Sequence, residues 1–153
     1  MKPILLTILL MLSMHISGAE YVGAEACGAC HQAQLKQWQK SDHFHAMQIA
    51  NSASVLGDFS DVEVEFHGIK TRFFKRQDSY FIETLDEDSE VRVLKVLYAF
   101  GHDPLQQYLV DIGSGKLQAF SIAWDSRSKK NGGQRSFHLQ PQEDISPAHP
   151  FFW

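Results

Sequence analysis

The sequence predicts an α+β protein in which short N-terminal helices precede a region of antiparallel β-sheet. Residues 24–53 are rich in Ala, Gln, Lys, Met and Leu, which are residues that favour helices. From Asp61 onward, stretches of the chain alternate apolar and polar residues with the period of half-buried strands. The chain has 153 residues, a length that fits one domain with a hydrophobic core.

The first 19 residues have the three-part pattern of a secretory signal peptide. Lys2 supplies a positive end, residues 4–12 form an apolar run, and residues 17–19 are small. The apolar run is well short of the ~20 residues that a membrane-spanning helix needs, which argues against a retained anchor. We therefore expect cleavage after Ala19 and a protein that is exported to the periplasm.

Residues 20–55 are predicted to form a helical segment with two helices and a bend between them. Residues 32–39 contain no Gly, Pro or β-branched residue, which favours a first helix. Ser41 and Asp42 form a plausible N-cap for a second helix that continues to about Asn51.

Residues 56–140 are predicted to form the antiparallel β region. Residues 62–66 alternate as a strand, and residues 71–75 and 79–84 flank a hairpin loop at 76–78. A second hairpin is predicted by the glycines at 113 and 115, which separate residues 107–112 from residues 116–124.

The β region is expected to end with a strand at residues 135–139, after a loop at 126–133. Residues 141–153 contain three prolines and are predicted to form an irregular tail.

The sequence Cys27-Gly28-Ala29-Cys30-His31 is the strongest chemical signal in the chain. A Cys-x-x-Cys-His motif is typical of c-type haem attachment. Its two thiols add to the two vinyl groups of the haem, and the adjacent histidine binds the iron. We therefore predict one covalent haem c, held by Cys27 and Cys30, with His31 as the proximal iron ligand.

Three other interpretations of the two cysteines were weighed. A thioredoxin-like dithiol needs a preceding strand, and only seven residues separate Cys27 from the expected cleavage site. A zinc site needs two further ligands, for which His43 and His45 could be offered, but the rest of a zinc-finger pattern is missing. A disulfide between Cys27 and Cys30 would leave the adjacent His31 unexplained.

His43 is the predicted second axial ligand, and His45 and Met47 are alternatives. In one unbroken helix His31 and His43 would lie ~18 Å apart along the axis. Two ligands of one iron lie only ~4 Å apart. His43 can therefore bind the same iron only if the chain turns back near residues 40–42, and otherwise it is free to reach another haem. The remaining histidines of the second half are interpreted as polar strand or loop residues: His67, His102, His138 and His149.

The charge of the chain excludes one class of partner. The formal net charge is −4 at pH 7, and cleavage of the leader would remove Lys2 and make the mature chain more acidic. This balance gives no electrostatic reason to bind nucleic acid. No apolar stretch after the leader approaches the length of a membrane span.

Several motifs resemble the opening of large exported multihaem cytochromes of the cytochrome c-552/c-554 type, some of which continue into tetratricopeptide repeats. In the first half these motifs are Tyr21–Gly23, Cys27–His31, Trp38, Ser41, His43 and Ala46–Met47. In the second half they are residues 98–101, 104–110, 118–126 and 132–138.

This resemblance implies that the Ser-x-His element provides distal haem ligation, which favours His43 over His45. Members of the family carry further haem motifs downstream, whereas this sequence stops at Trp153. It resembles an N-terminal module alone, truncated or shortened, in which His43, His67 or His138 could be ligands for haems that are missing.

The function expected from these features is single-electron transfer to a redox partner protein, such as a multihaem cytochrome. An electron carrier is favoured over a catalyst, because the chain shows no nucleophile with its base and no paired catalytic carboxylates. The alternatives are a haem enzyme or small-ligand sensor with an open iron site, and a module that docks a partner through its β region.

Overall fold

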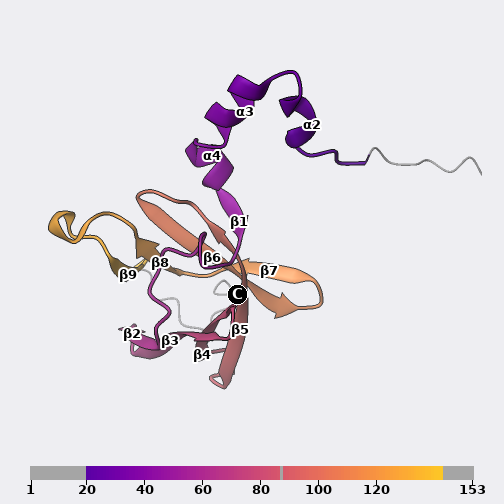
Figure 1. The fold of residues 1–153 in the computed structure, drawn as a ribbon. Coiled ribbons are helices and arrows are strands. Elements are labelled where there is room, and N and C mark those ends of the chain that lie inside the picture. The colour runs from indigo at the N-terminus through magenta and orange to yellow at the C-terminus, as the bar shows by residue number, and fades with distance from the viewer. Residues whose placement is uncertain (1–19, 87, 143–153) are drawn as a thin grey trace, which may run out of the picture. The chain divides into compact units, whose positions relative to one another are not determined.

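A computed structural model describes residues 20–86 and 88–142 of the chain (Figure 1). The predicted signal peptide at residues 1–19 and residues 143–153 of the predicted tail lie outside the described residues. The chain divides into two units, one ending at Lys36 and one beginning at Gln37. The predicted domain boundaries at residues 55 and 140 stay predictions.

The described helices are short. Helix α2 spans Glu25–Gly28, α3 spans Gln32–Trp38 and α4 spans Asp42–His45. None of their residues is buried. No helix among the described residues is long and apolar enough to cross a membrane.

The described strands form one antiparallel, nine-stranded sheet. Their bounds are β1 Met47–Ile49, β2 Val62–Phe66, β3 Ile69–Arg76, β4 Ser79–Leu85, β5 Val91–Phe100, β6 Leu105–Gly113, β7 Lys116–Ala119, β8 Ile122–Asp125 and β9 Arg135–His138. A 3₁₀ turn, η1, spans Lys129–Asn131 before β9. The strand order is β2-β3-β4-β5-β6-β8-β9, and β1 and β7 pair with β5 and β6 respectively.

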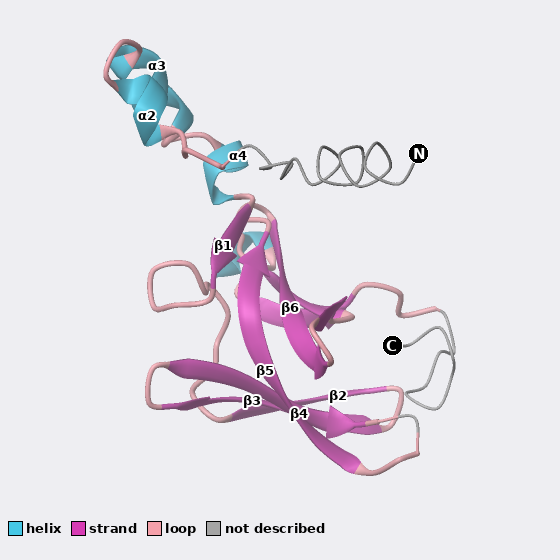
Figure 2. Ribbon diagram, turned by 90° about the vertical axis from the view of Figure 1, so that its right-hand side faces the viewer, coloured by secondary structure: helices cyan, strands magenta, loops and turns pink. Residues whose placement is uncertain are grey.

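Strand β5 is a long strand near the middle of the strand order, and it pairs with different strands along its length (Figure 2). Its first part pairs with β4 from Val91 to Val96, and its last part pairs with β1 from Tyr98 to Phe100. Strand β6 pairs along the other edge of β5, with a register irregularity between Val96 and Tyr98. Such irregularities bend a strand and increase its twist.

The core lies on the inner face of the sheet and is centred on Phe59. This ring makes edge-to-face contacts with Phe73, Tyr80 and Tyr108 at centroid distances of 5.1–5.3 Å. The remaining apolar core residues are Ile82, Leu94, Val96, Ala99, Val110, Phe120, Ile122 and Trp124. Burial of its hydroxyl raises the pKa of Tyr108.

The predicted α+β fold with N-terminal haem-binding helices is wrong, because the described chain is mainly antiparallel β-sheet. The second helix was expected to reach about Asn51 but ends at His45. Met47–Ile49 instead forms β1, with Met47 opposite Phe100 and Ile49 opposite Tyr98. Pairing with β5 satisfies backbone groups of these residues, and this tertiary interaction outweighs their local helix preference.

The predicted β elements are largely confirmed. The alternating residues 62–66 form β2, and the predicted hairpin around residues 76–78 joins β3 and β4. The glycine turn at 113–115 joins β6 and β7. The predicted strand at 116–124 is two strands, β7 and β8, and the last strand is β9.

Candidate haem-attachment site

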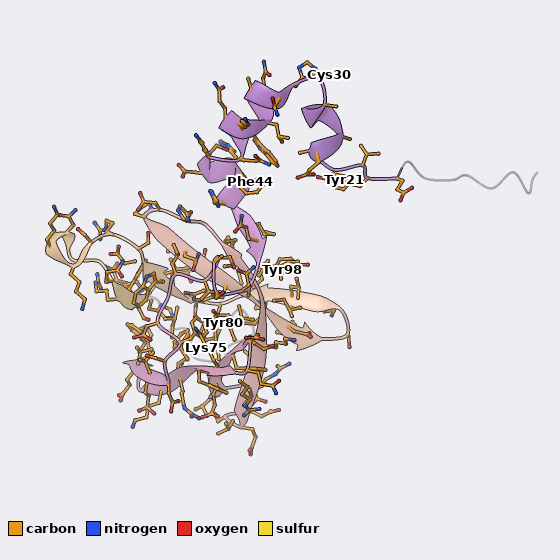
Figure 3. The ribbon with its side chains drawn as sticks, viewed as in Figure 1. Tyr21, Cys30, Phe44, Lys75, Tyr80 and Tyr98 are labelled. Atoms are coloured by element: carbon orange, nitrogen blue, oxygen red, sulfur yellow. The ribbon has the colours of Figure 1, made fainter. Side chains whose placement is uncertain are left out.

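Cys27, Cys30 and His31 lie in and beside the turn between α2 and α3. The backbone N–H groups of Cys30 and His31 both donate to the carbonyl of Cys27, at 3.3 and 3.0 Å. The N–H of Leu35 then donates to the carbonyl of His31 at 3.0 Å, which starts α3 directly after the motif. The motif is therefore held as one hydrogen-bonded turn, with Cys30 at its exposed side (Figure 3).

The two cysteines have the state that haem attachment requires. Both are free thiols, and both are exposed. His31 is exposed as well. A haem is a large planar group, and thioether formation needs two unpaired thiols at its vinyl groups, so the exposed turn fits this cofactor.

His43 lies in the second unit, on the single-turn helix α4. The Ser41 side chain caps this helix by accepting a hydrogen bond from the Phe44 N–H at 3.4 Å, as the sequence predicted. The same hydroxyl donates to the carbonyl of Trp38 at 2.6 Å. His43 is exposed. His45 is half-buried, and its Nδ1 lies 3.3 Å from Nε2 of Gln48.

Met47 does not lie on a helix. It is the first residue of β1 and is 57% exposed. Its predicted role as an alternative iron ligand is not tested by this position, and neither is the ligand role of His43.

A hollow in the second unit is lined by His43 and also by His102, which the sequence indicated as a polar strand or loop residue. Asp42, Ala46, Gly101, Asp103 and Leu105 complete its lining, and its volume is about 250 Å³. His102 follows β5 directly, and its ring stacks on that of His45. No local sequence pattern marks His102, because its proximity to α4 results from the pairing of β1 with β5.

His67 and His138 meet at another position of the β-sheet. Their rings contact edge to face at 5.1 Å, and His138 is buried. The backbone N–H of Gln140 donates to His138 Nδ1 at 3.2 Å. These contacts agree with the prediction that both residues are structural parts of strands and turns.

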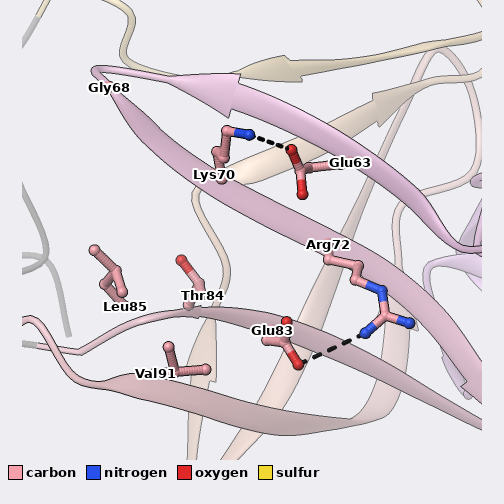
Figure 4. A pocket seen from close by; sticks show the side chains of 8 residues that line it. All are labelled: Glu63, Gly68, Lys70, Arg72, Glu83, Thr84, Leu85 and Val91. Atoms are coloured by element: carbon pink, nitrogen blue, oxygen red, sulfur yellow. Dashed lines mark ion pairs between the residues drawn. The ribbon is translucent and has the colours of Figure 1, made fainter.

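Another hollow contains a row of ion pairs (Figure 4). It lies over β2–β5 and has a volume of about 330 Å³. Lys70 is paired with Glu63 at 3.0 Å, and Arg72 lies 3.8 Å from Glu83. Arg72 also pairs with Asp61, whose pKa this hydrogen bond lowers. Exposed pairs of this kind contribute little to stability and supply no nucleophile or proton relay.

Among the described residues, no group of three or more His, Cys, Asp or Glu side chains is arranged to hold a metal ion directly.

The comparisons with known proteins agree with the haem interpretation. Residues 26–78 match the family model described as cytochrome c554 and c-prime. A search of curated proteins and a search of solved structures each gave no match. The matched region begins next to Cys27 and includes His43 and the β3–β4 hairpin as far as Asp78. Residues 26–78 are therefore similar to c-type cytochromes of the cytochrome c554 type.

Proposed function

We propose that this chain is an exported electron carrier with one haem c, bound through Cys27 and Cys30 and ligated by His31. The observation that carries this proposal is the hydrogen-bonded turn with two free, exposed thiols next to an exposed histidine. The turn lies inside the region that matches the cytochrome c554 family.

The second axial ligand in this proposal is His43. The haem supplies a reversible one-electron couple at its iron. The imidazoles of His31 and His43 would both hold the iron of a bound haem and leave no position for a substrate, so that the group would supply electron transfer. His43 supports this role because it lies on α4 and its side chain is exposed to solvent.

Export is part of the same proposal. Residues 1–19 have the pattern of a cleaved signal peptide. Export to the periplasm would bring the thiols to the compartment in which haem c is attached. The partner would be another redox protein, such as a multihaem cytochrome, and no nucleic acid.

The proposal is tested on the full chain, exported from a host that attaches haem c. Electron paramagnetic resonance and the effect of carbon monoxide on the absorption spectrum report the coordination of the iron. We expect a low-spin haem that carbon monoxide does not change, with one reversible electron per chain in a redox titration. A high-spin haem that binds carbon monoxide would instead support the open-site enzyme or sensor.

A further inference from the structure

Residues 126–135 form a basic loop, which runs from the end of β8 through η1 to the first residue of β9. The loop contains no acidic residue and four basic residues, namely Arg127, Lys129, Lys130 and Arg135. All four are exposed, and the loop extends away from the strands that it joins (Figure 1). The chain as a whole has a formal net charge of −4, so this loop is locally positive in a chain that is negative overall. A surface region of one sign attracts groups of the opposite sign.

Three of the four cations are not ion-paired among the described residues. The carboxylate of Asp125 binds Arg127 and offsets its charge. Lys129, Lys130 and Arg135 take part in none of the ion pairs between described residues. The Nε–H of Arg135 donates to a backbone carbonyl of the loop at 2.9 Å, and this neutral acceptor leaves its charge in place. The basic loop therefore presents three positive charges to solvent.

Hydrogen bonds within the loop hold these cations in a defined arrangement. The side-chain amide of Gln134 donates to the carbonyls of Ser126 and Arg127, at 2.8 and 3.1 Å. The N–H of Gly133 donates to the carbonyl of Ser128 at 3.2 Å. A side chain at position 133 would collide with the Arg127 carbonyl oxygen, so the two sides of the loop pack closely there. A loop that is already ordered loses little conformational entropy when a partner binds.

The composition of the loop favours a protein partner over a lipid membrane. Peripheral binding to a membrane combines basic residues with apolar side chains that enter the bilayer. The basic loop has no apolar side chain, because its residues are Ser, Arg, Lys, Asn, Gly and Gln. Exposed charges of this kind act mainly by steering a surface of opposite charge into contact.

We propose that the basic loop docks an acidic protein surface through Lys129, Lys130 and Arg135. This inference goes beyond the proposed electron transfer, because it assigns an interaction surface to the unit that contains the sheet and does not depend on the haem. The attraction acts between exposed charges, so the affinity falls as the salt concentration rises.

Binding of the exported full chain to poly-L-glutamate, an acidic polypeptide, tests this inference. Lys129→Glu with Lys130→Glu reverses two charges of the basic loop, whereas Lys129→Arg with Lys130→Arg keeps them. Lys36→Glu with Lys116→Glu is the matched control, because both lysines are exposed, lie outside the loop and make no ion pair among the described residues. Fluorescence anisotropy of labelled poly-L-glutamate, at low and at raised salt, measures the affinity. Circular dichroism shows whether each variant is folded.

We expect the wild type to bind poly-L-glutamate and raised salt to weaken this binding. Reversal of the two loop charges should lower the affinity on the order of tenfold. The arginine variant and the control should stay close to the wild type.

The inference is overturned if the wild type does not bind poly-L-glutamate, or if the loop variant and the control lose affinity equally. It is also overturned if the wild type binds vesicles containing phosphatidylglycerol in preference to poly-L-glutamate, because the partner would then be a lipid surface. None of these results bears on the haem, so a failure of the docking surface is distinguishable from a failure of the proposed function.

Discussion

The side-chain amide of Gln106 on β6 donates a hydrogen bond to the backbone carbonyl of Ser54 at 2.8 Å. Its oxygen accepts a hydrogen bond from the N–H of Leu56, also at 2.8 Å. Gln106 is 2% exposed; its bond to Ser54 is buried and the bond from Leu56 is partly buried. The two bonds hold the loop that follows β1 and contains Phe59. They thereby connect the α4–β1 segment to strand β6 of the sheet.

Replacing Gln106 with Leu should destabilise the protein. The substitution keeps a similar volume but leaves the Ser54 carbonyl and the Leu56 N–H without their partner. Each buried backbone group left unpaired costs about 1–3 kcal/mol. Urea denaturation should show the loss as a lower midpoint. Gln118→Leu is the control, since its side chain makes only a local bond to Ala119, and an equal loss there would contradict the account.

Replacing Phe59 with Ala should remove the centre of the core. A buried Phe-to-Ala change costs about 3–5 kcal/mol, through lost burial and the cavity that remains. Phe81 is half-buried on the outer side of the β3–β4 hairpin, stacked on Phe74. We expect Phe81→Ala to cost clearly less in the same unfolding measurement. Equal costs would show that the core is not centred on Phe59.

Asp125 should make the stability of the protein sensitive to acid. Arg127 donates to both oxygens of its carboxylate at 2.9 and 2.6 Å, which lowers the Asp125 pKa below its ordinary value of 3.8. A lowered folded-state pKa stabilises the fold above the ordinary pKa, and this contribution is lost as the pH falls through the folded value.

The stability difference between the wild type and Asp125→Asn should therefore be larger near neutral pH than at about pH 3. Urea unfolding at the two pH values measures it. Asp78→Asn, in the exposed β3–β4 turn, controls for loss of a negative charge. A difference that grows on acidification would contradict the role of the Asp125–Arg127 pair.

The sequence predicted the local β elements well because their signals are local. Alternation along Val62–Phe66 and the turn residues at Gln77–Asp78 and Gly113–Gly115 each determine structure over a few residues. The Ser41 cap was predictable for the same reason, since its hydrogen-bond partner is Phe44.

The sequence could not predict where the second helix ends. Residues 46–51 have reasonable helix propensity, and the signal that overrides it is the pairing of β1 with β5, fifty residues away. His102 was missed for the same physical reason, because its stacking on His45 depends on that pairing. The Cys-x-x-Cys-His motif, by contrast, is contained in five consecutive residues, so it can be recognised from the sequence alone.

The central claim is that Cys27 and Cys30 hold one haem covalently. The most direct test is the pyridine haemochrome assay with intact mass on the exported, purified chain, beside a Cys27→Ser/Cys30→Ser variant. We expect one haem per wild-type chain that survives denaturation, and none covalently bound in the variant. A wild-type chain without covalent haem, from a host that attaches haem c to a control cytochrome, would contradict it.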